Sequence, residues 1–195
     1  VGSSFSNTNL GKYMIISFSG LPGAGKSSIA HRLAADLGWP YYDMGTLRRQ
    51  IAAKKGLTIE EYNKIGENDP STDTEVDYYQ ADLGKEQDNF VIVGRTSWHF
   101  IPHSLKILLS VRPEISAERV FNDLEKRNES GELNSIAAVR AMLDRRFEND
   151  KKRFATYYSL ELYNEGDYDW ILDTSDLSPE QAYQQVWEYV QSKIA

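Results

Sequence analysis

Five short apolar segments alternate with helical patterns along this chain. They span Tyr13–Ser19, Trp39–Tyr42, Phe90–Val93, Leu105–Val111 and Trp170–Leu172, and each has the length of a buried strand. Strands that alternate with helices are typical of a parallel sheet that carries helices on both faces. The pattern therefore predicts one α/β domain built on a five-stranded parallel sheet.

Local signals mark where the helices begin. These starts lie near Lys26, at the capping box Thr58-Ile59-Glu60-Glu61, at Pro113 and at Ser178-Pro179. We expect the helix after Pro113 to run to about Arg127, where a charged, loop-like segment, 127–135, separates two helices. The last helix has a core-facing stripe at Ala182, Val186, Tyr189 and Val190.

A glycine-rich segment between the first strand and the first helix carries the clearest chemistry. Gly20-Leu21-Pro22-Gly23-Ala24-Gly25-Lys26-Ser27 fits the pattern G-x-x-x-x-G-K-[ST] without a mismatch. Such a loop wraps the phosphates of a nucleotide with backbone N–H groups, and the helix start adds the positive end of a dipole. We predict that this loop binds ATP or GTP, that Lys26 reaches the terminal phosphates and that the Ser27 hydroxyl binds Mg²⁺. The predicted ATP-binding residues are Gly20, Gly23, Ala24, Gly25, Lys26, Ser27 and Ser28.

Composition adds limits on the class of protein. The 195 residues are 41% hydrophobic and 26% charged, and no apolar stretch approaches the length of a membrane span. The net charge of −7 argues against a general nucleic-acid binder, and the absence of cysteine excludes disulfides and thiolate sites. Residues 1–13 lack a signal-peptide core, and we expect a disordered tail or a cloning remnant there. We expect a cytoplasmic monomer whose partners are small nucleotides, without nucleic-acid or membrane partners.

Further motifs follow the phosphate loop in a fixed order. The first are a small-residue turn followed by an arginine in Asp43–Arg49, the segments Gly56–Lys64 and Asn68–Pro70, and Thr72–Asp77 with Gln80. After them come the strand Val91–Arg95, which ends in Gly-Arg, the pair Arg146 and Arg153 seven residues apart, and the segment Tyr168–Ser175. Together they cover about 180 residues from Met14 to the end. In this order they resemble the nucleoside monophosphate kinases, and most closely the archaeal-type cytidylate kinases.

The resemblance implies a P-loop NTPase fold, in which a parallel five-stranded sheet carries helices on both faces. It implies a single kinase domain over residues 14–195, with an NMP-binding helical insertion at about 44–88 and a lid at about 127–153. The implied reaction is ATP- and Mg²⁺-dependent phosphoryl transfer to a nucleoside monophosphate, foremost from CMP or dCMP to the diphosphate.

The resemblance also assigns roles to individual residues. Phosphoryl transfer depends on positioning and positive charge, and arginine binds phosphate oxygens in pairs. Arg49 and Arg95 are the expected clamp on the acceptor phosphate. Arg146 and Arg153, two helical turns apart, are expected to act in catalysis with Lys26. The remaining assignments are Arg127 at ATP, and Asp77 and Gln80 at the acceptor base.

Three departures from the family pattern leave alternatives open. Val93 stands where the family has an acidic residue, Arg48 stands where it has an apolar one, and the helix before Arg127 is about one turn longer. One hypothesis is that Asp43 supplies the carboxylate that Val93 lacks. The alternatives are a P-loop kinase with another acceptor (AMP, UMP, a nucleoside or a sugar acid) and a nucleotide-binding protein without turnover. An uncharged acceptor would not need the arginine clamp.

Overall fold

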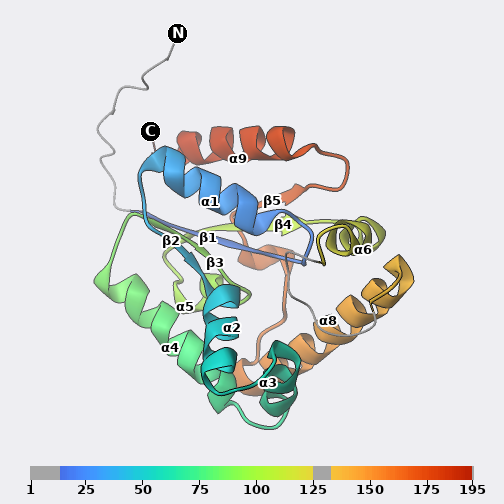
Figure 1. Cartoon of the computed structure of the whole chain (residues 1–195). Helices are drawn as coiled ribbons and strands as arrows, with labels where there is room; N and C mark the ends of the chain where they lie inside the picture. The colour runs from blue at the N-terminus through green and yellow to red at the C-terminus, as the bar shows by residue number, and fades with distance from the viewer. Residues whose placement is uncertain (1–13, 125–132, 195) are drawn as a thin grey trace.

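A five-stranded parallel sheet forms the centre of the protein, in the order β2-β3-β1-β4-β5 (Figure 1). The structure, a computed structural model, describes residues 14–124 and 133–194. The strands are β1 (Ile15–Gly20), β2 (Tyr41–Asp43), β3 (Phe90–Val93), β4 (Leu105–Ser110) and β5 (Trp170–Asp173). Every one of the five predicted segments forms a strand, which confirms the predicted α/β fold class.

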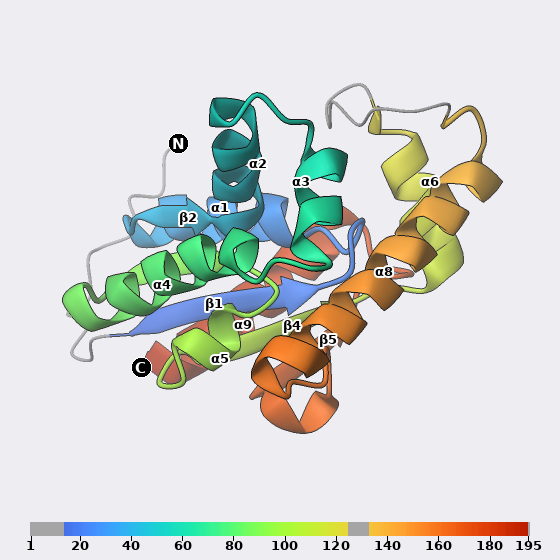
Figure 2. The ribbon, with the colours of Figure 1, turned by 90° about the horizontal axis from the view of Figure 1, so that it is seen from below.

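Helices cover both faces of this sheet. Helices α1 and α9 lie on one face, and α4 and α5 lie on the other, as Figures 1 and 2 show together. The described helices are α1 (Lys26–Leu37), α2 (Met44–Lys54), α3 (Ile59–Gly66), α4 (Ser71–Glu86), α5 (Ser97–Phe100), α6 (Pro113–Phe121), α8 (Ile136–Tyr158) and α9 (Pro179–Ile194), with a 3₁₀ turn at Glu165–Asp167. Within the described ranges, no helix is long and apolar enough to cross a membrane.

The two faces of β1 supply two separate cores. All six residues of β1 are buried, and alternate side chains point to opposite faces. Ile16 and Phe18 belong to the core under α1 and α9, whereas Ile15 belongs to the core with α2 and α4. Its apolar residues fill both cores, and its two buried serines are hydrogen-bonded, Ser17 to Ser104 and Ser19 to the Gly94 carbonyl, each at 2.8 Å.

Helix ends agree with the sequence signals except in one place. The Thr58–Glu61 capping box forms at the start of α3. Helix α6, however, ends at Phe121, not at about Arg127 as predicted. Asn122 is its C-cap, and the Asp123 N–H donates to the Val120 carbonyl at 3.1 Å. Short polar side chains such as those of Asn and Asp compete with the helical backbone, which favours an end at this point.

Two groups of helices flank the carboxyl edge of the sheet (Figure 2). Helices α2, α3 and α4 connect β2 to β3, and α6 and α8 lie between β4 and β5. Helices α6 and α8 pack on each other through a small core of Ala117, Val120, Val139 and Leu143. Helix α8 also reaches the end of α3, where the Tyr157 hydroxyl donates to the Gly66 carbonyl at 3.2 Å. In open α/β sheets, ligands bind at this carboxyl edge.

Candidate active site

The glycine-rich loop approaches neighbouring backbone too closely for side chains. A Cβ on Gly20, whose φ is +137°, would lie 2.0 Å from the Leu109 carbonyl oxygen. Gly25 caps α1 in the left-handed conformation, and no side chain caps this helix start. The first N–H groups of α1 are therefore left for an anion.

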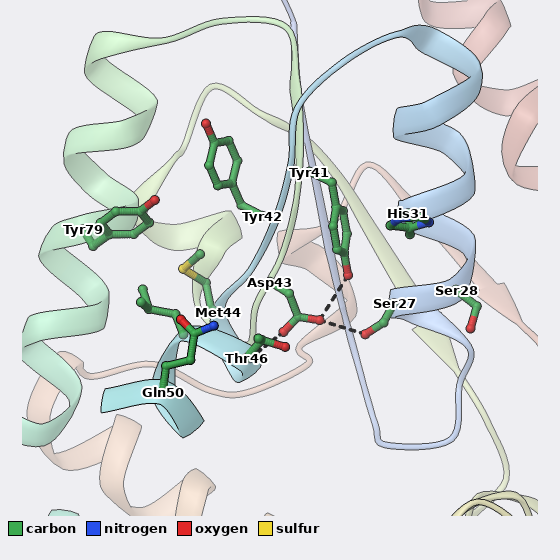
Figure 3. A pocket seen from close by; sticks show the side chains of 11 residues that line it. Ser27, Ser28, His31, Tyr41, Tyr42, Asp43, Met44, Thr46, Gln50 and Tyr79 are labelled. Atoms are coloured by element: carbon green, nitrogen blue, oxygen red, sulfur yellow. Dashed lines mark hydrogen bonds between the residues drawn. The ribbon is translucent and has the colours of Figure 1, made fainter. Parts of the chain in front are cut away.

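The two polar side chains of the loop are held by internal hydrogen bonds. The Lys26 ammonium donates to the Leu21 carbonyl at 2.6 Å, so it lies across the loop. The Ser27 hydroxyl donates to Asp43 Oδ2 at 3.0 Å (Figure 3). Ser28 is exposed, and Ala24 is fully buried. Ala24 therefore supports the loop from the core side.

A cavity of about 200 Å³ brings the loop together with the predicted arginines. Arg49 comes from α2, Arg95 from the turn after β3, and Arg146 and Arg153 from α8. They lie at distant points of the sequence, and the fold brings them to one side of the loop. The cavity is lined by Gly20, Pro22, Lys26, Ser27, Asp43, Met44, Gly45, Arg48, Arg49, Ile59, Asp73, Val76, Asp77, Val93, Gly94, Arg95, Thr96, Arg146, Arg153 and Phe154.

Buried ion pairs link the arginines under this cavity. Arg95 Nη1 lies 2.7 Å from Asp150 Oδ2, and Arg153 Nη2 donates to Asp150 Oδ1 at 2.9 Å. Arg153 Nε lies 2.8 Å from Asp73 Oδ2, and Arg48 Nη1 donates to Asp73 Oδ1 at 2.7 Å. We call these five residues the buried ion-pair chain. Three guanidiniums and two carboxylates leave it with a net charge of +1.

Burial perturbs the groups of this chain in the expected directions. It lowers the pKa of Arg48 and raises the pKa of Asp73, because both lose hydration of their charged forms. Asp73 offsets part of the cost for Arg48, and Asn63 and the Thr72 carbonyl accept two more of its hydrogen bonds. These partners explain how a buried arginine fits at this position.

Sequence reasoning singled out neither Asp73 nor Asp150 as a site residue. Asp150 carried a local signal, because it lies three residues before Arg153 on the same helix, a spacing that places two side chains side by side. Asp73 carried none, since its pairing with Arg153 joins residues far apart in the sequence.

The two residues predicted to contact the acceptor base differ in their access to the cavity. Asp77 lines it, whereas Gln80 is only 1% exposed and lies behind it. The Gln80 amide donates to Asp77 Oδ1 at 2.7 Å and to Thr96 Oγ1 at 3.0 Å, and its carbonyl accepts from Ser97 at 2.8 Å. Gln80 is therefore placed to orient Asp77.

Asp77 is a perturbed acid at the cavity wall. Burial raises its pKa to about 6, and hydrogen bonds from Tyr158 (2.6 Å), Thr96 (3.0 Å) and Gln80 counteract this shift. The carboxylate therefore accepts three hydrogen bonds in a mostly desolvated setting. Perturbed acids in clefts are characteristic of functional sites.

Three further arginines are Arg49 and Arg127, which were predicted as site residues, and Arg119, which was not. Arg49 is exposed on α2, where Nη2 donates to Thr46 Oγ1 at 3.3 Å. Arg127 lies outside the described residues. Arg119 ties the phosphate loop to the end of β5, because it donates to the Gly23 carbonyl at 3.2 Å and to the Thr174 carbonyl at 2.8 Å.

Two oxygen donors that fit Mg²⁺ meet where the phosphate loop lies beside β2. This ion prefers oxygen ligands and usually combines one or two protein groups with phosphates and waters. The Ser27 hydroxyl and the Asp43 carboxylate are such donors and lie 3.0 Å apart. Val93 ends β3, is 5% exposed, and has no polar atom on its side chain. In the part of the chain that the structure describes, no three His, Cys, Asp or Glu residues cluster as a metal site by themselves.

Comparisons with known proteins agree with this geometry. The model of the cytidylate kinase-like family matches residues 15–176. A cytidylate kinase from Methanocella arvoryzae is 33% identical over 164 residues, which cover 83% of this chain and 88% of that protein. One from Archaeoglobus fulgidus is 31% identical over 181 residues, which cover 92% of this chain and 96% of that protein.

A likeness to solved structures supports the fold alone. The shikimate kinase from Bacteroides thetaiotaomicron superposes with a TM-score of 0.60 at 15% identity, over 92% of this chain and 99% of that one. The sheet order, the phosphate loop and the sequence relatives agree with one another. The chain belongs to the cytidylate kinase-like family and is a kinase with a P-loop NTPase fold.

Proposed function

We propose that this protein transfers a phosphoryl group from ATP, with Mg²⁺, to a nucleoside monophosphate, foremost CMP or dCMP. The observation that carries the proposal is the cavity that Lys26 and Ser27 line together with five arginines. Joining two highly charged anions requires fixed positive charge more than covalent chemistry. The names of the relatives support cytidylate as the acceptor class.

The phosphate loop holds the donor in this proposal. The N–H groups of the loop and of the α1 start bind the β- and γ-phosphates, and Lys26 exchanges its bond to the Leu21 carbonyl for a phosphate oxygen. Ser27 binds Mg²⁺, and the bound ion neutralises charge that develops on the phosphate oxygens.

Arg49 and Arg95 hold the acceptor phosphate. A planar guanidinium can bind two phosphate oxygens at once and keeps its charge at neutral pH. The half-buried Arg95 already faces a carboxylate, Asp150, at 2.7 Å, so its guanidinium is oriented before the substrate arrives. This preorganisation favours a phosphate-bearing acceptor over an uncharged one.

Arg146 and Arg153 act on the transferring phosphoryl group from α8, and Arg127 contacts ATP. We expect the segment at about 127–153 to close over both substrates, because water in the site would hydrolyse ATP in place of transfer. Asp77 contacts the acceptor base, with Gln80 and Tyr158 holding its carboxylate in place.

A coupled assay that follows ADP formation tests this function. ATP and Mg²⁺ are supplied with CMP, dCMP, UMP, AMP, cytidine or a sugar acid in parallel. We expect the highest kcat/KM with CMP or dCMP and no transfer to cytidine. A Lys26→Ala variant is the control for contaminating kinases. Preference for an uncharged acceptor would contradict the proposal.

Val93 favours one rival function. The resemblance implies an acidic residue at this position and Val93 has no carboxylate, so the rival is a member of the family that binds nucleotide without turnover. Transfer to none of the monophosphates at high Mg²⁺, together with tight ADP binding, would support that rival and exclude the kinase reaction.

A further inference from the structure

Two strand ends beside the phosphate loop carry different side chains. Asp43 ends β2 and is paired in register with Val93 at the end of β3. The Val93 side chain is apolar and 5% exposed, so it can neither accept a hydrogen bond nor offset a cation's charge. The carboxylate of this edge therefore lies on β2 and not on β3.

Local hydrogen bonds fix the orientation of Asp43. Oδ1 accepts from the Thr46 N–H at 2.8 Å and thereby caps the start of α2. This bond directs Oδ2 toward the loop, where it accepts from the Ser27 hydroxyl at 3.0 Å and from the Tyr41 hydroxyl at 3.1 Å (Figure 3). Burial and the nearby carboxylate raise the pKa of Tyr41, so Tyr41 acts as a neutral donor.

The surroundings of Asp43 leave room for a hydrated ion. Besides the arginine-lined cavity, a wider cavity of about 790 Å³ lies along β2. Ser27, Asp43 and Met44 line both cavities, so the carboxylate lies where the two meet. Mg²⁺ usually keeps several of its waters and needs such space.

We propose that Asp43 is the carboxylate of the Mg²⁺ site and does the work of the acid missing at Val93. It accepts a hydrogen bond from the Ser27 hydroxyl, which would leave the serine oxygen's lone pairs for the metal, and it would accept a second hydrogen bond from a metal-bound water. The inference rests on the proposed function only in requiring that the loop binds a nucleotide with Mg²⁺. It assigns the carboxylate to β2, on the same residue that caps the helix bearing Arg49.

Asp43→Asn is the matched variant, because asparagine caps a helix start as well as aspartate does, while the negative charge and the acceptor Oδ2 that faces Ser27 are lost. The measurement is ADP binding by calorimetry, with Mg²⁺ and again with EDTA. The wild-type gain in ADP affinity on adding Mg²⁺ should fall about 10- to 100-fold in the variant, the usual effect of losing an outer metal partner. With EDTA, ADP should bind the variant as tightly or more tightly, since a negative charge near the phosphates is gone.

Tyr42→Phe is the control on the same strand. Its hydroxyl donates to Gln87 at 2.9 Å and does not contact Asp43, so both ADP affinities should stay within about twofold of the wild type. Mn²⁺ titration of the protein–ADP complex, followed by electron paramagnetic resonance, should show weaker Mn²⁺ binding in Asp43→Asn alone. Unchanged melting temperatures establish that every variant is folded.

Two results would overturn the inference in different ways. If Mg²⁺ raises the ADP affinity of Asp43→Asn as much as that of the wild type, Asp43 only caps α2. The proposed kinase reaction would then stand. Wild-type protein that binds no ADP under either condition would remove the proposed function and the metal site with it.

Discussion

Replacing Asp73 by asparagine tests the buried ion-pair chain under the cavity. Asp73 is 4% exposed and is the only acid that contacts Arg48 within that chain of five residues. It also lies 2.8 Å from Arg153 Nε. Asparagine has nearly the same shape, so the substitution removes charge and leaves the packing intact. The variant then contains three guanidiniums, two of them buried, and one carboxylate.

The structure sets the size of the expected effect. Removing one partner of a buried ion pair costs about 3–5 kcal/mol, because the other charge is left without compensation. The asparagine carbonyl can still accept one hydrogen bond, so we expect the lower end, about 3 kcal/mol. For a protein of this size, that loss lowers the melting temperature by roughly 6–12 °C.

Calorimetric melting at pH 7 measures the change, with Glu75→Gln as the matched control. Glu75 lies two residues further along α4, but its ion pair with Lys55 is 3.5 Å long and exposed. Losing that pair should cost at most about 0.5 kcal/mol. If Asp73→Asn melts within about 2 °C of the wild type, the buried ion-pair chain does not stabilise the fold and the reasoning is refuted.

Three further predictions concern the site itself. Lys26→Ala should lower kcat by about 100-fold or more with an unchanged melting temperature, and a near-normal kcat would remove its role at the donor. Arg95→Ala should lower kcat/KM for CMP roughly 30- to 1,000-fold, from a loss on the order of 2–4 kcal/mol, while its ADP affinity stays at the wild-type value. The exposed control Arg32→Ala should keep the wild-type kcat/KM, and an unchanged kcat/KM in Arg95→Ala would place the acceptor elsewhere. Burial raises the pKa of Asp77 to about 6. Between about pH 4 and 6, Asp77 is therefore protonated in the folded protein and ionised in the unfolded chain. Wild-type stability relative to Asp77→Asn, measured by urea unfolding, should therefore fall by roughly 2–3 kcal/mol as the pH rises through this window, and a difference independent of pH would contradict the shifted pKa.

Local physics made much of this protein predictable from its sequence. The strands were visible because a sheet covered on both faces favours short, mainly apolar runs. The phosphate loop was visible because Gly20 must approach the Leu109 carbonyl without a Cβ, and the capping box because Thr58 and Glu61 bond within one helical turn. In each case the residues that make the structure are close in sequence or are constrained at a single position.

Where α6 ends was not predicted correctly, because apolar spacing alone does not show where a short polar residue such as Asn122 stops a helix. For the site, the sequence named most of the arginines that line the cavity, through the resemblance and their spacing. It did not show that Arg153 shares Asp73 with Arg48, or that Gln80 is buried behind Asp77.

Those relations were decided by tertiary structure alone. Asp73 and Arg153 come from α4 and α8, and Ser27 and Asp43 from α1 and β2. Charge pairing acts over a few ångströms of space, and residues far apart in the sequence reach that range only after the sheet and its helices have packed. The sequence by itself therefore determined which chemical groups this protein carries and on which elements, and the packing of those elements decided which of them meet.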